Sequence, residues 1–163
     1  VNAFAFTAWP ATWDRVFYGT GLTARALRDH DRNLDCAVNV IRNRYKPADT
    51  AIVHAVAWLP LGLRHFMYYL PKFDHYQLSE DRAIGTPFDK PMVSAKDGRI
   101  EFVREMDLAN KRIVLLIVPP GQSLQIFEPY LDLTAAREVP GSGGQIYELA
   151  ADLVVHRRPL QQP

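Results

Sequence analysis

The sequence predicts an α/β fold: a single layered domain with a mainly parallel central sheet, flanking helices and an antiparallel edge formed by the carboxyl end. The first observation is a stretch that reads as strand, helix and strand. Thr50 to Trp58 is β-branched and apolar, Leu59-Pro60 interrupts it, and residues 61–70 have helical spacing. Pro71 ends that helix, and His75 to Leu78 resumes extended character. This order is typical of a parallel βαβ crossover.

Further runs complete the predicted sheet. The aliphatic run IVLLIV, residues 113–118, is closed by Pro119-Pro120-Gly121. A continuous apolar run between turn signals indicates a central strand that is buried on both faces. Strand candidates at 135–139 and 145–149 are joined by the turn sequence Pro-Gly-Ser-Gly-Gly. This last pair of strands predicts the antiparallel edge.

Helices and connections are expected around this sheet. A long amphipathic helix is predicted from about Thr23 to Tyr45, followed by a proline-containing turn at 46–49. Residues 81–97 have no clear period and predict a loop with room for a short helix. The run 99–106 alternates apolar and polar residues and fits either a half-buried strand or a short helix. Residues 123–131 have the spacing of a short amphipathic helix.

Composition excludes several classes of function. The 163 residues suffice for one domain with its own core. A formal net charge of +1 provides no basic field, so no nucleic-acid partner is expected. Cys36 is the only cysteine, so an internal disulfide and cysteine-based zinc motifs are excluded, and the role of this thiol stays open. The longest apolar run, 51–63, falls short of the roughly 18–20 residues that span a bilayer.

The predicted organisation has three parts: an aromatic, juxtamembrane-like segment at 1–21, the α/β domain at 22–155 and a flexible tail at 156–163. Aromatic rings are dense in the first part, at Phe4, Phe6, Trp9, Trp13, Phe17 and Tyr18. Such density is typical of the belt where a chain leaves the lipid headgroups. The alternative that stays open is that these rings pack on the core of the domain.

The histidines are the first candidates for a metal site. His54, His65 and His75 lie on different predicted elements, and no HExxH or HxH pair fixes two of them on one face. No metal site is therefore expected. The more ordinary interpretation is that His54 bonds to backbone within its strand, while His65 and His75 are surface or boundary groups.

No catalytic residue is predicted. Asp31 and Asp35 share the long helix with Arg28 and Arg32, which favours a solvated, salt-bridged face over an acid/base cluster. Neither a GxSxG elbow nor a Cys/His couple is present. The glycine-rich stretch 140–144 lies between strands, whereas phosphate-binding amides align at the start of a helix. No cofactor is therefore expected.

The predicted ligand-binding residues are Trp58, Arg64, Glu80 and Asp81. In open α/β sheets, ligands bind outside the carboxyl ends of the parallel strands, and these residues follow the predicted strands toward that rim. Trp58 is expected to offer a stacking surface, and Arg64 is expected to pair with an anion.

Four segments, taken in order, resemble a known family: RALRDHDRNLDCAVNVIRNRYKPADTAIV, RHFMYYLPKFDHYQL, KRIVLLIVPP and REVPGSGGQIYEL. Together they resemble the soluble carboxyl-terminal domain of multi-spanning membrane glycosyltransferases of the protein-mannosyltransferase-like type. The resemblance covers roughly residues 22–150 and rests on structural features such as the YYLP helix end and the glycine-rich closing strand.

The resemblance implies an accessory, extracytoplasmic domain of a membrane-attached enzyme whose donor is a polyprenyl-phosphate sugar. The acidic catalytic residue of such enzymes lies in a loop of the membrane portion, so no catalytic residue is carried over to this chain. The implied partners are the membrane-embedded portion of the same polypeptide and a lipid-linked sugar or glycan acceptor. Two alternatives stay open: a stand-alone α/β module that binds a small ligand, and a divergent soluble transferase.

Overall fold

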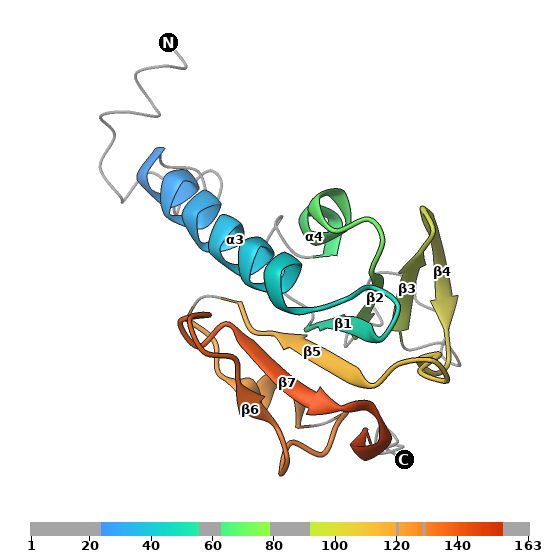
Figure 1. The fold of residues 1–163 in the computed structure, drawn as a ribbon. Coiled ribbons are helices and arrows are strands. Elements are labelled where there is room, and N and C mark those ends of the chain that lie inside the picture. The colour runs from blue at the N-terminus through green and yellow to red at the C-terminus, as the bar shows by residue number, and fades with distance from the viewer. Residues whose placement is uncertain (1–23, 56–62, 79–91, 120, 129, 155–163) are drawn as a thin grey trace, which may run out of the picture. The chain divides into compact units, whose positions relative to one another are not determined.

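The computed structural model describes residues 24–55, 63–78, 92–119, 121–128 and 130–154 (Figure 1). In the first turns of the two α-helices among these residues, at 24–30 and 63–65, it describes the backbone alone. The chain divides into two compact units, Val1–Asn39 and Val40–Pro163, and the boundary falls within helix α3 (Ala24–Arg44).

Helix α3 confirms the predicted long helix. Its buried residues follow the spacing i, i+3, i+4 and i+7, at Leu34, Ala37, Val38 and Ile41. Asp31 and Asp35 are exposed, so these carboxylates lie on the solvated face, as predicted. Arg42 and Arg44 occupy the last turn, where cations interact favourably with the helix dipole.

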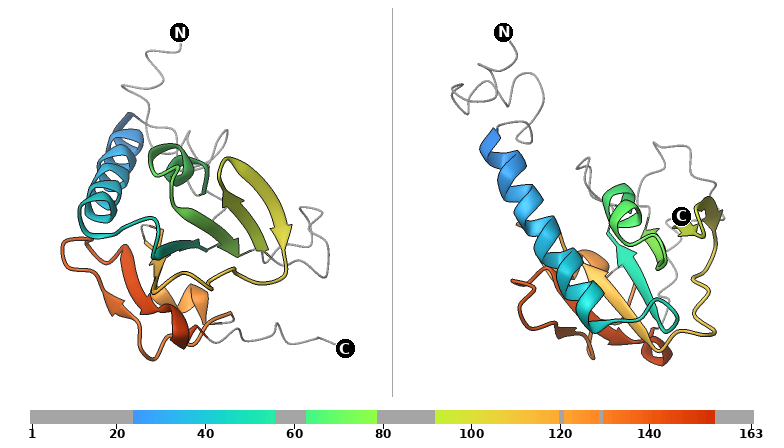
Figure 2. Two further views of the ribbon diagram at one scale, coloured as in Figure 1. Left: turned by 45° about the vertical axis from the view of Figure 1, so that its right-hand side comes forward. Right: turned by 45° about the horizontal axis from the view of Figure 1, so that its top comes forward.

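The unit Val40–Pro163 is built on a seven-stranded mixed sheet with the order β4-β3-β2-β1-β5-β7-β6 (Figure 2). The strands are β1 (Thr50–His54), β2 (Asp74–Leu78), β3 (Met92–Lys96), β4 (Arg99–Val103), β5 (Ile113–Ile117), β6 (Arg137–Glu138) and β7 (Ile146–Ala150). Strand β1 runs parallel to both β2 and β5, and every other neighbouring pair is antiparallel. The predicted parallel centre and the antiparallel carboxyl-terminal edge are confirmed. A second antiparallel edge, formed by β3 and β4, makes the sheet mixed rather than mainly parallel.

This second edge is a hairpin. The prediction of a loop through residue 97 is wrong for Met92–Lys96, which forms β3. Asp97 and Gly98 have φ angles of 50° and 75°, as a two-residue type I′ turn requires, and Lys96 pairs with Arg99 across it. Of the two alternatives for the run 99–106, the strand is correct for Arg99–Val103, but all five residues of this strand are exposed or only partly buried.

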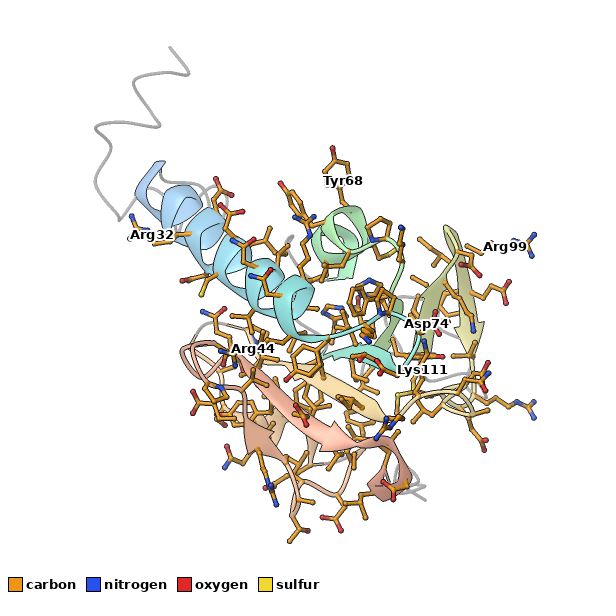
Figure 3. All side chains as sticks on the ribbon, in the orientation of Figure 1. Arg32, Arg44, Tyr68, Asp74, Arg99 and Lys111 are labelled. Atoms are coloured by element: carbon orange, nitrogen blue, oxygen red, sulfur yellow. The ribbon has the colours of Figure 1, made fainter. Side chains whose placement is uncertain are left out.

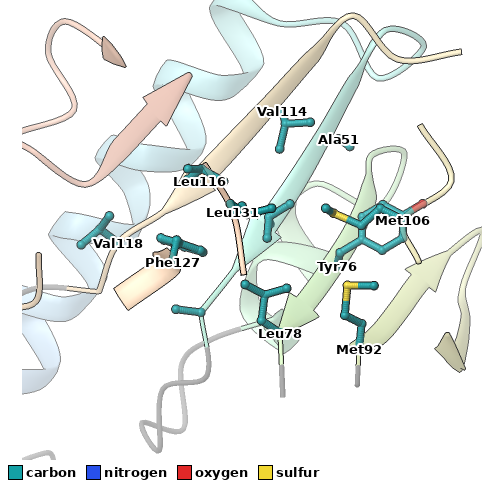
Figure 4. Packing of buried hydrophobic residues seen from close by; sticks show 12 residues of the cluster. Ala51, Tyr76, Leu78, Met92, Met106, Val114, Leu116, Val118, Phe127 and Leu131 are labelled. Carbon is teal, nitrogen blue, oxygen red and sulfur yellow. The ribbon is translucent and has the colours of Figure 1, made fainter. Parts of the chain in front are cut away.

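Side chains alternate between the two faces of the sheet. Helix α4 (Leu63–Tyr69) lies on the face that carries His54 and His75. The ring of its buried Phe66 is tilted by 53° against that of His54, with the ring centroids 5.1 Å apart. The opposite face carries a hydrophobic cluster of buried side chains, which includes Phe127 and Leu131 (Figure 4). Phe127 ends a short 3-10 helix, η2 (Leu124–Phe127), where the sequence predicted an amphipathic helix over 123–131. A further 3-10 turn, η3 (Ala151–Leu153), follows β7.

The hydroxyl of Tyr45, just after α3, donates a hydrogen bond of 2.7 Å to Glu148 Oε2 on β7. Burial, together with this carboxylate, raises the pKa of Tyr45 well above its ordinary value, so the phenol remains a donor. We expect Tyr45→Phe to lower the free energy of unfolding by about 1 kcal/mol in urea denaturation. Tyr68→Phe is the control, because Tyr68 is 79% exposed. Equal losses in the two variants would contradict the assignment.

Candidate functional site

The carboxyl ends of β2, β1 and β5 meet at one edge of the sheet, because β1 is parallel to both neighbours. The chain leaves β1 toward β2 on one side and later reaches β5 on the other, which makes the space between β1 and β5 a topological switch point. Of the residues predicted to bind ligand there, Trp58, Glu80 and Asp81 lie outside the described residues. Arg64 belongs to α4, but its side chain also lies outside the described part. Their ligand-binding role stays a prediction.

A polar cavity of about 560 Å³ lies over β2, β3 and β4, on the side of the sheet that carries the hydrophobic cluster. Tyr76, Ser94 and Glu101 line it and are neighbours across the three strands. Glu105 and Asp107, in the segment after β4, line it as well. On this side of the sheet the hairpin β3–β4 carries the polar side chains of Ser94, Lys96, Arg99 and Glu101.

Both signs of charge line this cavity. Lys96 and Arg99 supply two cations, and four carboxylates line it as well, those of Asp97, Glu101, Glu105 and Asp107. The hydroxyl of Tyr76 donates to the carbonyl oxygen of Asp107 and accepts from its amide, each at 3.1 Å, which ties the segment after β4 to β2. Desolvation by burial is the main cause that raises the pKa of Tyr76, so this hydroxyl stays protonated.

An ion cluster adjoins the cavity at the amino end of β2. Lys111 Nζ lies 3.0 Å from Asp74 Oδ2, and both side chains are nearly buried, with exposed fractions of 8% and 9% (Figure 3). Lys111 also donates to the carbonyl oxygen of Pro47 at 2.8 Å. Lys96 Nζ lies 3.4 Å from the same oxygen of Asp74 and 3.6 Å from Asp107 Oδ2. The negative charge of Asp74 is the largest cause that raises the pKa of Lys96.

Asp74 Oδ2 makes no well-aligned hydrogen bond within the described part of the chain, so these contacts are chiefly electrostatic. Spacing along the sequence did not predict this ion cluster. The available signal was a charged residue immediately before or within each apolar strand: Asp74 opens β2, and Lys111-Arg112 precedes β5.

Two buried histidines meet beneath α4. The ring nitrogens His54 Nε2 and His75 Nδ1 are 3.2 Å apart, and His75 Nε2 lies 3.0 Å from the carbonyl oxygen of Leu70. Since a carbonyl only accepts, His75 donates from Nε2 to Leu70. When His75 is neutral, its Nδ1 therefore accepts from His54 Nε2.

Burial explains why the pair stays neutral. Desolvation is the largest cause that lowers the pKa of both imidazoles, and proximity to His75 lowers that of His54 further. The hydrogen bond to Leu70 and the charge of Asp74 raise the pKa of His75, but by less than burial lowers it. The prediction that His75 lies at the surface or boundary is wrong, since it is 1% exposed. The described partner of His54 is a side chain rather than backbone, and the side chain of His65 lies outside the described residues.

Within the described residues, no group of three or more histidine, cysteine, aspartate or glutamate side chains is arranged to hold a metal ion. Those residues also contain no helix that is both long and apolar enough to cross a membrane. The described residues thus form an α/β fold with a cavity of about 560 Å³ that is lined mostly by polar side chains. No protein-family model, curated protein or solved structure matches the chain.

Proposed function

We propose that this chain is a sugar-binding accessory domain, non-catalytic by itself, of a membrane glycosyltransferase that uses a polyprenyl-phosphate sugar on the extracytoplasmic side. The observation that carries the proposal is the polar cavity over β2, β3 and β4. The resemblance of the four segments to protein-mannosyltransferase-like enzymes supports the choice of ligand and of partner. That partner is the membrane-embedded portion of the same polypeptide.

The chemistry of the cavity suits a sugar. A sugar hydroxyl both donates and accepts hydrogen bonds, so it needs acceptors and donors side by side. Glu101 and Glu105 accept, Lys96 and Arg99 donate, and the Ser94 hydroxyl does both. An arginine at the edge of the cavity also suits the phosphate of a lipid-linked sugar, because a guanidinium pairs with phosphate through two parallel hydrogen bonds.

The proposal is tested by titrating the chain with a panel of hexose 1-phosphates and following amide shifts by NMR. We expect shifts along β3 and β4, and Glu101→Gln should weaken binding about tenfold by removing a charged acceptor. Asp35→Asn, on the exposed face of α3, is the matched control and should bind as the wild type does.

Trp58→Ala and Arg64→Ala test the rim at the carboxyl ends of the parallel strands. If only these variants weaken binding, the sugar binds at the rim and the cavity is not its site. If none of the variants changes the affinity of the folded chain, the sugar-binding proposal is wrong. Turnover of a lipid-linked sugar by the chain, above a heat-killed control, would contradict the non-catalytic assignment.

A further inference from the structure

The outermost strands at the two edges of the sheet differ in length. At one edge, β6 has two residues, which is too short to template another strand. At the other edge, β4 has five residues and pairs with β3 along its whole length without a bulge. In the part of the chain that the structure describes, β3 is the only strand paired with β4.

The hairpin register fixes which backbone groups of β4 point away from β3. Lys96 and Arg99 flank a two-residue turn, so they exchange both of their backbone hydrogen bonds. Because bonded and non-bonded pairs alternate along an antiparallel ladder, the N–H and C=O groups of Ile100 and Phe102 point away from β3. Their side chains are 60% and 43% exposed. Apolar side chains and outward backbone groups thus occur on the same residues.

We propose that β4 pairs antiparallel with β4 of a second copy of this chain, around a twofold axis at Ile100. In this register Ile100 lies opposite the partner's Ile100, and Arg99 lies opposite the partner's Glu101. The twofold axis repeats that ion pair, so the interface contains it twice. Arg99 and Glu101 occupy non-hydrogen-bonded positions of the new ladder, where facing side chains approach most closely.

The charges select this register over its neighbour. Sliding the partner strand by two residues would place Ile100 opposite the partner's Phe102 and would keep the backbone bonds. It would also set the two Glu101 carboxylates directly opposite each other, which is unfavourable. The sequence Arg-Ile-Glu of β4 is thus self-complementary in one antiparallel register. An interface of one short strand per copy falls below about 1,000 Å², so the dimer is expected to be reversible.

Sedimentation velocity of the full chain over a range of concentrations, without sugar, tests the proposal. Arg99→Glu and Glu101→Arg should each lower the association constant about tenfold or more, because each turns both ion pairs into like-charge pairs. The double variant Arg99→Glu/Glu101→Arg should restore association to near the wild-type value. Arg137→Glu, on the short β6 edge, is the matched control and should change nothing.

Ile100→Pro gives an independent test that leaves the hairpin intact. The N–H of Ile100 points away from β3, so proline there removes a bond of the proposed interface and none of the β3–β4 ladder. We expect this variant to be monomeric and to retain the wild-type circular dichroism spectrum. A wild-type chain that stays monomeric up to about 1 mM overturns the proposal. So does a dimer that survives Ile100→Pro, or a double charge variant that fails to restore association.

Discussion

Replacing Asp74 by asparagine is expected to lower the free energy of unfolding by about 3 kcal/mol, measured by urea denaturation at pH 7.5. Asp74 faces the ammonium of Lys111 at 3.0 Å, and both side chains are nearly buried. Without the carboxylate, the charge of Lys111 stays buried with the carbonyl of Pro47 as its remaining described partner. Breaking a buried pair costs up to about 5 kcal/mol, and the retained bond to Pro47 keeps the loss at the lower end.

Two variants separate the loss of the ion pair from other effects of the substitution. Lys96→Met removes the other cation, whose side chain is 46% exposed, and should cost less than about 1 kcal/mol. Asp74→Asn/Lys111→Met removes both buried charges and should recover most of the stability lost in Asp74→Asn. If the double variant is no more stable than Asp74→Asn, the buried charge of Lys111 does not cause the loss of stability in Asp74→Asn.

Acid should destabilise the protein through the histidine pair. Between pH 7.5 and pH 5 we expect the free energy of unfolding to fall by about 2–4 kcal/mol. Folding lowers the pKa of both His54 and His75, so the unfolded chain binds more protons than the folded chain below its histidine pKa of about 6.5. Stability is therefore fully present above that value and is lost as the pH falls toward the folded pKa values. Urea denaturation at intervals of half a pH unit measures the slope.

His54→Phe isolates the contribution of the pair. The variant loses one titrating group and leaves His75 Nδ1 without its donor, so it should be less stable at neutral pH. Its stability should nevertheless fall less steeply with acid, by about 1 kcal/mol per pH unit relative to the wild type. An unchanged acid slope would show that His54 does not remain neutral in the folded protein.

Local patterns in the sequence predict much of this fold. Helix α3 could be predicted from its apolar period, and β5 from its aliphatic run. Each pattern arises because the residues that are buried in the fold must be apolar. Strand β3 was missed because Met-Val-Ser-Ala-Lys is short and half polar, as suits a strand whose one face lines a polar cavity. The Asp97-Gly98 pair between two short strands was the available signal for the hairpin.

The candidate site depends on topology and was much less predictable. Asp74 and Lys111 belong to segments on opposite sides of β1, and only the strand order brings them together. His54 and His75 meet because the parallel register sets Ile52 opposite His75. The sequence of one strand alone does not determine its register with a parallel neighbour. Polar residues at strand ends therefore acquire partners that spacing along the sequence does not reveal.

The position of β1 at the centre of the sheet has a consequence for synthesis of the chain. Its neighbour β2 follows soon after it, whereas its other neighbour pairs Thr50 with Ile113. Until β5 has left the ribosome, one side of β1 exposes unpaired backbone between apolar residues such as Ile52 and Val53. An incomplete sheet with an open apolar edge is the state in which nascent chains associate wrongly. For this protein, the vulnerable interval of translation ends with β5, well before the last strand of the sheet is made.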